Sequence, residues 1–183
     1  MASSGPSELS PRAKQIVEAA RELLEDEGLD ALSMRRLADR LGIRAPSLYK
    51  HFPDKQALEA AIISGGFLEQ AEAFEAALAD SDDSLGAIAV AYRSFARAHP
   101  HLYRLMTERP LQRDRLVPGA EDRAGLPVYQ AVGEDRDLAR AAWAFAHGMT
   151  NLELNGRFPP GADLDAAWRR GIDALRDLAA AGR

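Results

Sequence analysis

The chain has 183 residues, of which 46% are hydrophobic and 28% are charged, a balance typical of a globular protein rather than a disordered one. It contains no cysteine, which excludes disulfides, thiol catalysis and thiolate metal sites. No stretch approaches the roughly 18 apolar residues of a membrane span, and residues 1–12 lack the apolar segment of a signal peptide, so we expect a soluble cytoplasmic protein with no membrane partner.

The formal net charge of −5 conceals an uneven distribution. Between residues 33 and 55, six Lys or Arg side chains stand against two Asp side chains, so this stretch carries +4 and the rest of the chain −9. A basic patch on an acidic protein is what phosphate contact by one end of a molecule requires. Charge alone does not identify the partner, because a patch of this size is also common on solvated surfaces.

Residues 1–9 are rich in Ser, Gly and Pro and predict a flexible tail. Ser10 and Pro11 then form a helix start, with an N-cap hydroxyl followed by proline at the first helical position. Gly28 ends this first helix. Its apolar stripe consists of Ala13, Ile16, Val17, Ala20, Leu23 and Leu24. We expect this stripe to cover the two short helices that follow, which are too short to be stable alone.

Two short helices follow. Ser33 caps the first, which has a basic face, Gly42 makes the turn, and the second contains Pro46 and extends to about Phe52. Two short helices joined by a tight glycine turn predict a helix-turn-helix, whose second helix enters the DNA major groove. For two basic residues of the first short helix we favour a solvated role or pairing with Asp39; these are Arg36 and Arg40.

Asp54 begins a long helix that runs to about Ala79, and Gly65-Gly66 interrupts it, as a flexible point or as a place of close packing. Further helices are predicted over residues 84–98, 100–106, 128–132, 135–156 and 163–178, with a long irregular connection over 107–127. The helix over 135–156 is apolar on two faces, so we expect it to be buried on both. With no strand pattern, the sequence predicts an all-α fold of about nine helices.

The N-terminal helices carry a dense motif: Ile16-x3-Ala20-x2-Leu23-Leu24-x3-Gly28-Leu29-x2-Leu32-Ser33-Met34-Arg35-x-Leu37-Ala38-x2-Leu41-Gly42-Ile43-x4-Leu48-Tyr49-x-His51-Phe52-x2-Lys55. This motif resembles the head of the TetR family of ligand-responsive transcriptional regulators. A second segment is similar, more distantly, to the C-terminal domain of many such regulators: Trp143-x3-His147-Gly148-x4-Glu153-Leu154-x-Gly156-Arg157-Phe158. The resemblance implies a helix-turn-helix DNA-binding domain over 10–55 and a ligand-binding and dimerisation domain over 56–183.

The resemblance also implies which residues touch DNA. The positions at which the family contacts DNA hold Ser33, Arg35, Ala45, Ser47, Tyr49, Lys50, His51 and Lys55. Lys50 and the neighbouring Arg44 can each read a base or a phosphate, and the sequence does not say which. Tyr49 and His51 can donate to phosphate oxygens, and Lys55 can pair with a phosphate. Arg35 can bind guanine bidentately. Positions 45 and 47 depart from the bulkier or amide-bearing side chains used elsewhere in the family, so the operator sequence does not transfer.

Family members are homodimers that bind palindromic operators, usually as repressors, and release them when a small molecule enters the body. We expect the last two helices to form the dimer seam. A small, mostly hydrophobic effector would meet apolar side chains in the middle of the body, with polar anchors such as Asn151. The predicted effector contacts are Tyr92, Phe95, Tyr103, Met106, Trp143, Phe145, His147, Met149 and Asn151.

Two alternatives stay open. A small helical enzyme lacks support, because the chain has no HExxH, Ser/His/Asp, P-loop or GxGxxG signature, and we predict no catalytic residue, cofactor or metal site. Its weak metal candidates are His99 with His101, and His147 with Glu153. A DNA-associated module that responds to no ligand would need neither the effector site nor its coupling to DNA binding.

Overall fold

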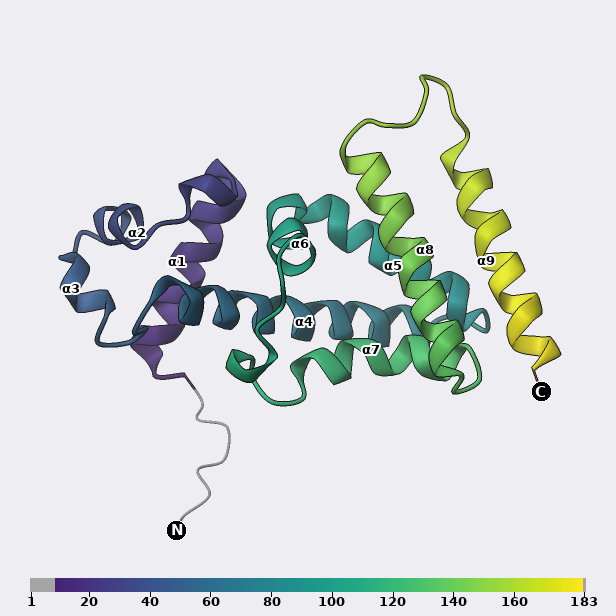
Figure 1. Ribbon diagram of the computed structural model, residues 1–183, viewed down its shortest axis with the longest axis horizontal. Coiled ribbons are helices and arrows are strands. Elements are labelled where there is room, and N and C mark those ends of the chain that lie inside the picture. The colour runs from purple at the N-terminus through teal and green to yellow at the C-terminus, as the bar shows by residue number, and fades with distance from the viewer. Residues whose placement is uncertain (1–8, 183) are drawn as a thin grey trace, which may run out of the picture. The chain divides into compact units, whose positions relative to one another are not determined.

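The computed structural model describes residues 9–182, and the predicted tail lies outside them except for Leu9. Every regular element in that range is helical, and nine of the elements are α-helices, which confirms the predicted all-α fold (Figure 1). The chain divides into two compact units. Unit 1 contains the described residues up to Phe67 together with His99–Glu121, and unit 2 contains Leu68–Ala98 and the described residues from Asp122 onward.

Three helices open unit 1: α1 (Pro11–Glu27), α2 (Met34–Arg40) and α3 (Ala45–Leu48), with a 3-10 turn η1 (Leu29–Ala31) after α1. The predicted cap of α1 is confirmed, since Ser10 Oγ accepts from the Ala13 N–H at 3.2 Å. Gly28 ends α1 with φ of +83°, a conformation that favours glycine. The core of the three helices is fully buried and includes Ile16, Leu23, Leu24, Leu37 and Leu48.

The long helix α4 (Lys55–Ala79) is continuous through Gly65-Gly66, so the predicted interruption is wrong. The close-packing explanation holds for Gly66, because a Cβ there would lie 2.6 Å from Met106 Sδ and 3.3 Å from Leu102. Both residues belong to α6 (Pro100–Thr107). The absence of a side chain at Gly66 therefore lets α6 pack closely on α4 within unit 1.

The connection after α6 is shorter than predicted. It contains the 3-10 turn η2 (Arg113–Arg115), and α7 (Ala120–Ala131) then starts eight residues before the predicted helix at 128. Gly125 and Pro127, which suggested a loop, lie inside α7. Packing outweighs their weak helix propensity, because Ala120 and Ala124 are buried and Arg123 of α7 forms an ion pair with Glu75.

In unit 2, α5 (Ser84–Ala98), α8 (Arg136–Leu154) and α9 (Leu164–Ala181) pack against one another (Figure 1). The predicted starts of the last two helices are confirmed, and both are capped locally. Asp135 accepts from the Asp137 and Leu138 N–H groups, and Asp163 accepts from the Ala166 N–H. Phe145 of α8 meets Trp168 of α9 edge-on, with ring centroids 5.5 Å apart. Glycine is required at Gly171, because a Cβ there would overlap the Phe145 ring.

The two-faced burial predicted for α8 does not occur within one chain. Ala142, Ala146 and Thr150 are buried, but Trp143 is 53% and Leu152 42% exposed. On α9, Leu178 is 60% exposed. These three apolar side chains leave part of the α8–α9 hairpin without a cover. Across the described residues, no helix is both long and apolar enough to cross a membrane.

Candidate DNA-binding surface

The α2–α3 turn is built from local signals. Ser33 Oγ accepts from the Arg36 N–H at 3.3 Å and so caps α2. Gly42 takes φ of +63°, and the Ile43 N–H returns to the Ala38 carbonyl at 3.0 Å. This left-handed glycine reverses the chain after α2, so α3 starts close to the end of α2 and packs on it.

The third helix is shorter than predicted, since α3 ends at Leu48 rather than near Phe52. The N–H groups of His51 and Phe52 both donate to the Leu48 carbonyl at 2.9 Å, which curls the chain into a turn. Leu48 and Phe52 are buried, so they fix this turn to the core. Tyr49, Lys50 and His51 are consequently held on the outside, with Tyr49 50% exposed.

The nine predicted DNA-contacting residues all lie on α2, on α3, in the turns beside them or at the start of α4. The five that are exposed are Arg35, Arg44, Tyr49, Lys50 and His51, and the four that are partly exposed are Ser33, Ala45, Ser47 and Lys55. The contact of these residues with DNA stays a prediction.

The basic residues of this region fall into two groups. Arg36 forms an ion pair with Glu27, and Arg40 pairs with Asp26 at 2.8 Å and Glu22 at 3.4 Å. The hydrogen bond from Arg40 to Asp26 raises the pKa of Arg40. The expectation of a role away from DNA agrees with these contacts, but the partners come from α1 rather than from Asp39, because α2 packs beside α1, which carries these acidic side chains.

Arg35, Arg44 and Lys50 form the second group. Within residues 9–182, no acidic side chain pairs with any of the three. Lys55 is intermediate, since its Nζ lies 3.2 Å from Glu59 one turn along α4. The outer face of α2 and α3 therefore presents uncompensated positive charge, which is suited to phosphate contact.

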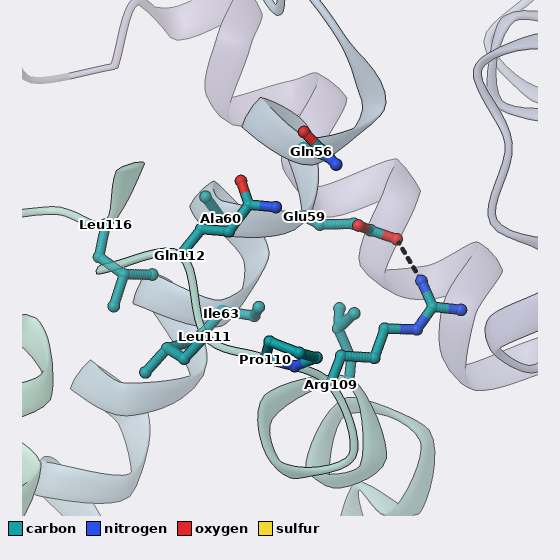
Figure 2. Close-up of a pocket in the computed structure, with 10 residues that line it drawn as sticks. Gln56, Glu59, Ala60, Ile63, Arg109, Pro110, Leu111, Gln112 and Leu116 are labelled. Carbon is teal, nitrogen blue, oxygen red and sulfur yellow. Dashed lines mark hydrogen bonds and ion pairs between the residues drawn. The ribbon is translucent and has the colours of Figure 1, made fainter. Parts of the chain in front are cut away.

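The predicted effector residues are distributed over both units. Tyr103 and Met106 are buried in α6 of unit 1, whereas Tyr92 and Phe95 are buried in α5 of unit 2. The remaining five lie on α8, namely Trp143, Phe145, His147, Met149 and Asn151. None of the nine lines the cavity of about 280 Å³ that lies beside α4 in unit 1 (Figure 2). Their role in binding an effector stays a prediction.

Some contacts around the head were missed from the sequence. Glu25 of α1 accepts from the N–H groups of His101 and Leu102 at the start of α6, at 3.4 and 2.9 Å. No sequence signal links residues that far apart. The pair Lys55–Glu59, by contrast, follows the i,i+4 spacing of helical ion pairs and could have been found.

The weak metal candidates are not assembled into a cluster. Among the residues described, no three His, Cys, Asp or Glu side chains group as metal ligands would. His99 occupies the N-cap position of α6, and the His101 ring lies close to Gly28, 3.4 Å from where a Cβ would stand.

Comparison with known proteins gives consistent matches along the chain. A family profile described as "Bacterial regulatory proteins, tetR family" matches residues 16–62, and one described as "Tetracyclin repressor-like, C-terminal domain" matches residues 85–175. An uncharacterised helix-turn-helix-type transcriptional regulator of Mycobacterium tuberculosis is 33% identical over 162 residues, which are 82% of this chain and 73% of that protein. The class C tetracycline repressor of Escherichia coli is 51% identical over 43 residues, 24% of this chain and 20% of the repressor.

Solved structures share the same fold. A protein of unknown function from Rhodococcus has a TM-score of 0.77 and 29% identity, covering 96% of this chain and 98% of that one. A TetR variant from Acinetobacter baumannii in complex with minocycline has a TM-score of 0.63 and 25% identity, covering 93% and 96%.

Proposed function

The chain belongs to the TetR family of transcriptional regulators, and on this basis we propose that it binds a palindromic DNA operator as a homodimer and releases it on binding a small, mostly hydrophobic effector. We also propose that the protein is cytoplasmic and that it represses the genes beside its operator. The family is a regulatory one, which supports a regulator over an enzyme.

One observation carries the DNA-binding part of this proposal. Three cations on one outer face, Arg35, Arg44 and Lys50, have no acidic partner among the described residues, although the chain as a whole carries −5. When unpaired cations of this kind neutralise DNA phosphates, they release the counterions condensed on the DNA, and this release favours binding. Tyr49 and His51 in the adjoining turn add hydroxyl and imidazole donors for the phosphate oxygens.

Operator selection from a random duplex library with the purified full-length protein tests the DNA-binding proposal. We expect an enriched sequence with two inverted half-sites, centred about 34–36 Å apart or a multiple of this. The genes beside matching genomic sites would then indicate the class of effector. Failure to bind any duplex at low ionic strength would overturn the proposal.

The dimer is supported by the uncovered apolar side chains of the α8–α9 hairpin, Leu152 and Leu178 among them. Two such hairpins can form an intersubunit four-helix bundle, which places two heads on one duplex. We expect Leu152→Glu together with Leu178→Glu to give a monomer in sedimentation and to lower operator affinity strongly. Val90→Glu on α5, where the valine is 67% exposed, is the matched control and should stay dimeric. A wild-type protein that sediments as a monomer at micromolar concentration would contradict the seam.

A further inference from the structure

The segment between α6 and α7, residues 108–119, is anchored along the first half of α4, and we call it the strap. Arg115 Nη1 donates to both carboxylate oxygens of Asp54 at 2.8 and 2.9 Å, which lowers the pKa of Asp54. The Val117 N–H donates to Ser64 Oγ at 2.9 Å. Ser64 is only 1% exposed, so this second anchor is shielded from water. The strap is therefore fixed at two points, one just before α4 and one midway along it.

The part of α4 between these anchors, from Gln56 to Ile63, lines a cavity of about 280 Å³ (Figure 2). This volume lies just below the range of about 300–1,000 Å³ for small-molecule sites. The apolar wall of the cavity comes from α4, α6 and the strap and consists of Ala60, Ile63, Leu105, Pro110, Leu111 and Leu116. Its polar groups are Gln56, Glu59, Arg109 and Gln112. An apolar wall with a few polar groups fits a ligand with a hydrocarbon part and one polar end.

The charge around Glu59, which lines the cavity, is unbalanced. Glu59 is the shared partner of two cations, because its Oε1 lies 3.2 Å from Lys55 Nζ and 3.4 Å from Arg109 Nη1. Figure 2 shows the pair with Arg109. Both distances are longer than the 2.7–2.9 Å of a good charge-assisted hydrogen bond. Arg109 is 48% exposed at its side chain and Glu59 only 13%. Lys55, the other cation, is 36% exposed at its side chain. The two cations together carry one positive charge more than Glu59 neutralises, and Arg109 is the more accessible of the two.

We propose, building on the function above, that this cavity binds a small carboxylic acid, with its carboxylate on Arg109 and its hydrocarbon chain against Ile63, Leu111 and Leu116. A guanidinium matches a carboxylate in bidentate geometry, which the existing contact with Glu59 does not use. The side-chain amides of Gln56 and Gln112, which also line the cavity, carry N–H groups of the kind that a carboxylate accepts. An amine would have only Glu59 as a carboxylate partner in the lining, and Glu59 already serves two cations, so the site discriminates against amines.

Occupancy of the cavity acts on DNA binding through Glu59. When the ligand carboxylate pairs with Arg109, Lys55 becomes the single cation paired with Glu59, and this ion pair along α4 becomes stronger. Lys55 is the predicted phosphate contact at the start of α4. When it pairs with Glu59 instead, each DNA-binding domain loses one contact with a DNA phosphate. The ligand thereby lowers operator affinity, and it lowers the salt dependence of binding as well.

The binding arm of the test uses no DNA. Purified full-length protein is titrated calorimetrically with n-octanoate, and with n-octylamine and n-octanol as probes of the same chain length. We expect saturable binding of octanoate, one per chain, and at least about tenfold weaker binding of the other two.

Arg109→Gln should abolish the preference for octanoate. Arg113→Gln is the matched control, because Arg113 lies in the strap but pairs with Glu121 outside the cavity lining. Equal binding of the three probes by the wild-type protein, or a preference for octanoate that survives Arg109→Gln, would overturn the site.

The second arm uses the selected operator duplex. Octanoate should weaken wild-type binding by about fivefold or more, and the Lys55→Gln variant, bound at lower salt, should lose most of this response. Octanoate that binds but leaves operator affinity unchanged would overturn the coupling through Glu59. A protein that binds octanoate and no duplex at all would overturn the proposed function and leave the carboxylate site standing, so the two failures are distinguishable.

Discussion

Helix α2 carries the same residue type on two sides with opposite outcomes. Arg36 and Arg40 pair with Glu27, Asp26 and Glu22 of α1, whereas Arg35 meets no acidic side chain in the described part of the chain. Adjacent residues of a helix point about 100° apart, so one step along the chain separates a cation that holds the head together from one that faces out. A count of basic residues therefore overstates the charge available to a partner.

The same distinction extends across the whole basic stretch. Of its six cations, Arg36, Arg40 and Lys55 have carboxylate partners, and Arg35, Arg44 and Lys50 have none among residues 9–182. A paired cation must give up its carboxylate before it can bind a phosphate, and an unpaired one need not. The unpaired group should therefore dominate operator binding, with Lys55 adjustable through Glu59.

The largest expected effect separates Arg35 from its neighbour Arg36. Arg35→Ala should weaken operator binding by about 1–3 kcal/mol, roughly fivefold to 150-fold, and relax the base preference at one position of each half-site. Arg36→Ala should leave operator affinity within about threefold, since that side chain is engaged with Glu27. Quantitative gel shifts with the selected operator and its single-base variants measure both. Equal weakening in the two variants would break the distinction between paired and unpaired cations.

A smaller effect is expected from the turn after α3. Tyr49→Ala and Lys50→Ala should each weaken binding severalfold, by a similar factor for all duplexes, because a phosphate contact carries no base information. For Lys50→Ala, the slope of log affinity against log salt should become shallower by about 0.9 for each phosphate that the variant no longer neutralises. Titrations at several salt concentrations give this slope. A change in base preference without a change in slope would reassign Lys50 to base recognition.

Lys55→Ala should also weaken binding and reduce the salt slope, but less than Lys50→Ala does. Lys55 already shares its charge with Glu59, so its phosphate contact is the weaker of the two. Glu59→Gln gives the complementary result, because it releases Lys55 and should raise operator affinity modestly. Fluorescence anisotropy with the selected duplex resolves both changes. A Glu59→Gln variant that binds more weakly than wild type would contradict the shared role of Glu59.

Local signals were sufficient for most of the fold. The caps Ser10, Ser33, Asp135 and Asp163 stand next to the residues they serve, so each helix start could be predicted from a few neighbouring residues. The start of α7 could not, because the buried side of Ala120 and Ala124 depends on distant helices and outweighs Gly125 and Pro127.

The candidate site shows the same division between local and distant information. Exposure of Tyr49 and Lys50 follows from the turn chemistry around them, and the helix-turn-helix pattern was enough to predict it. The neutralisation of Arg36 and Arg40 depends on how α1 lies against α2, which no short sequence window contains. The cavity beneath the strap was not predicted either, since it arises from residues about 50 positions apart, such as Glu59 and Arg109.

The smallest expected effect concerns the paired group itself. A double-mutant cycle on Arg36 and Glu27, with Arg36→Ala, Glu27→Ala and both together, should give a coupling of about 0.2–1 kcal/mol in chemical unfolding, the range of exposed ion pairs. Both side chains remain partly solvated, so raised salt should reduce the coupling further. The same cycle on Arg35 and Glu27 should give none, because Arg35 does not pair with α1. If Arg35 couples to Glu27 as strongly as Arg36 does, Arg35 is also paired with α1. The surface would then have one unpaired cation fewer for DNA binding, and the distinction between the two arginines would be wrong.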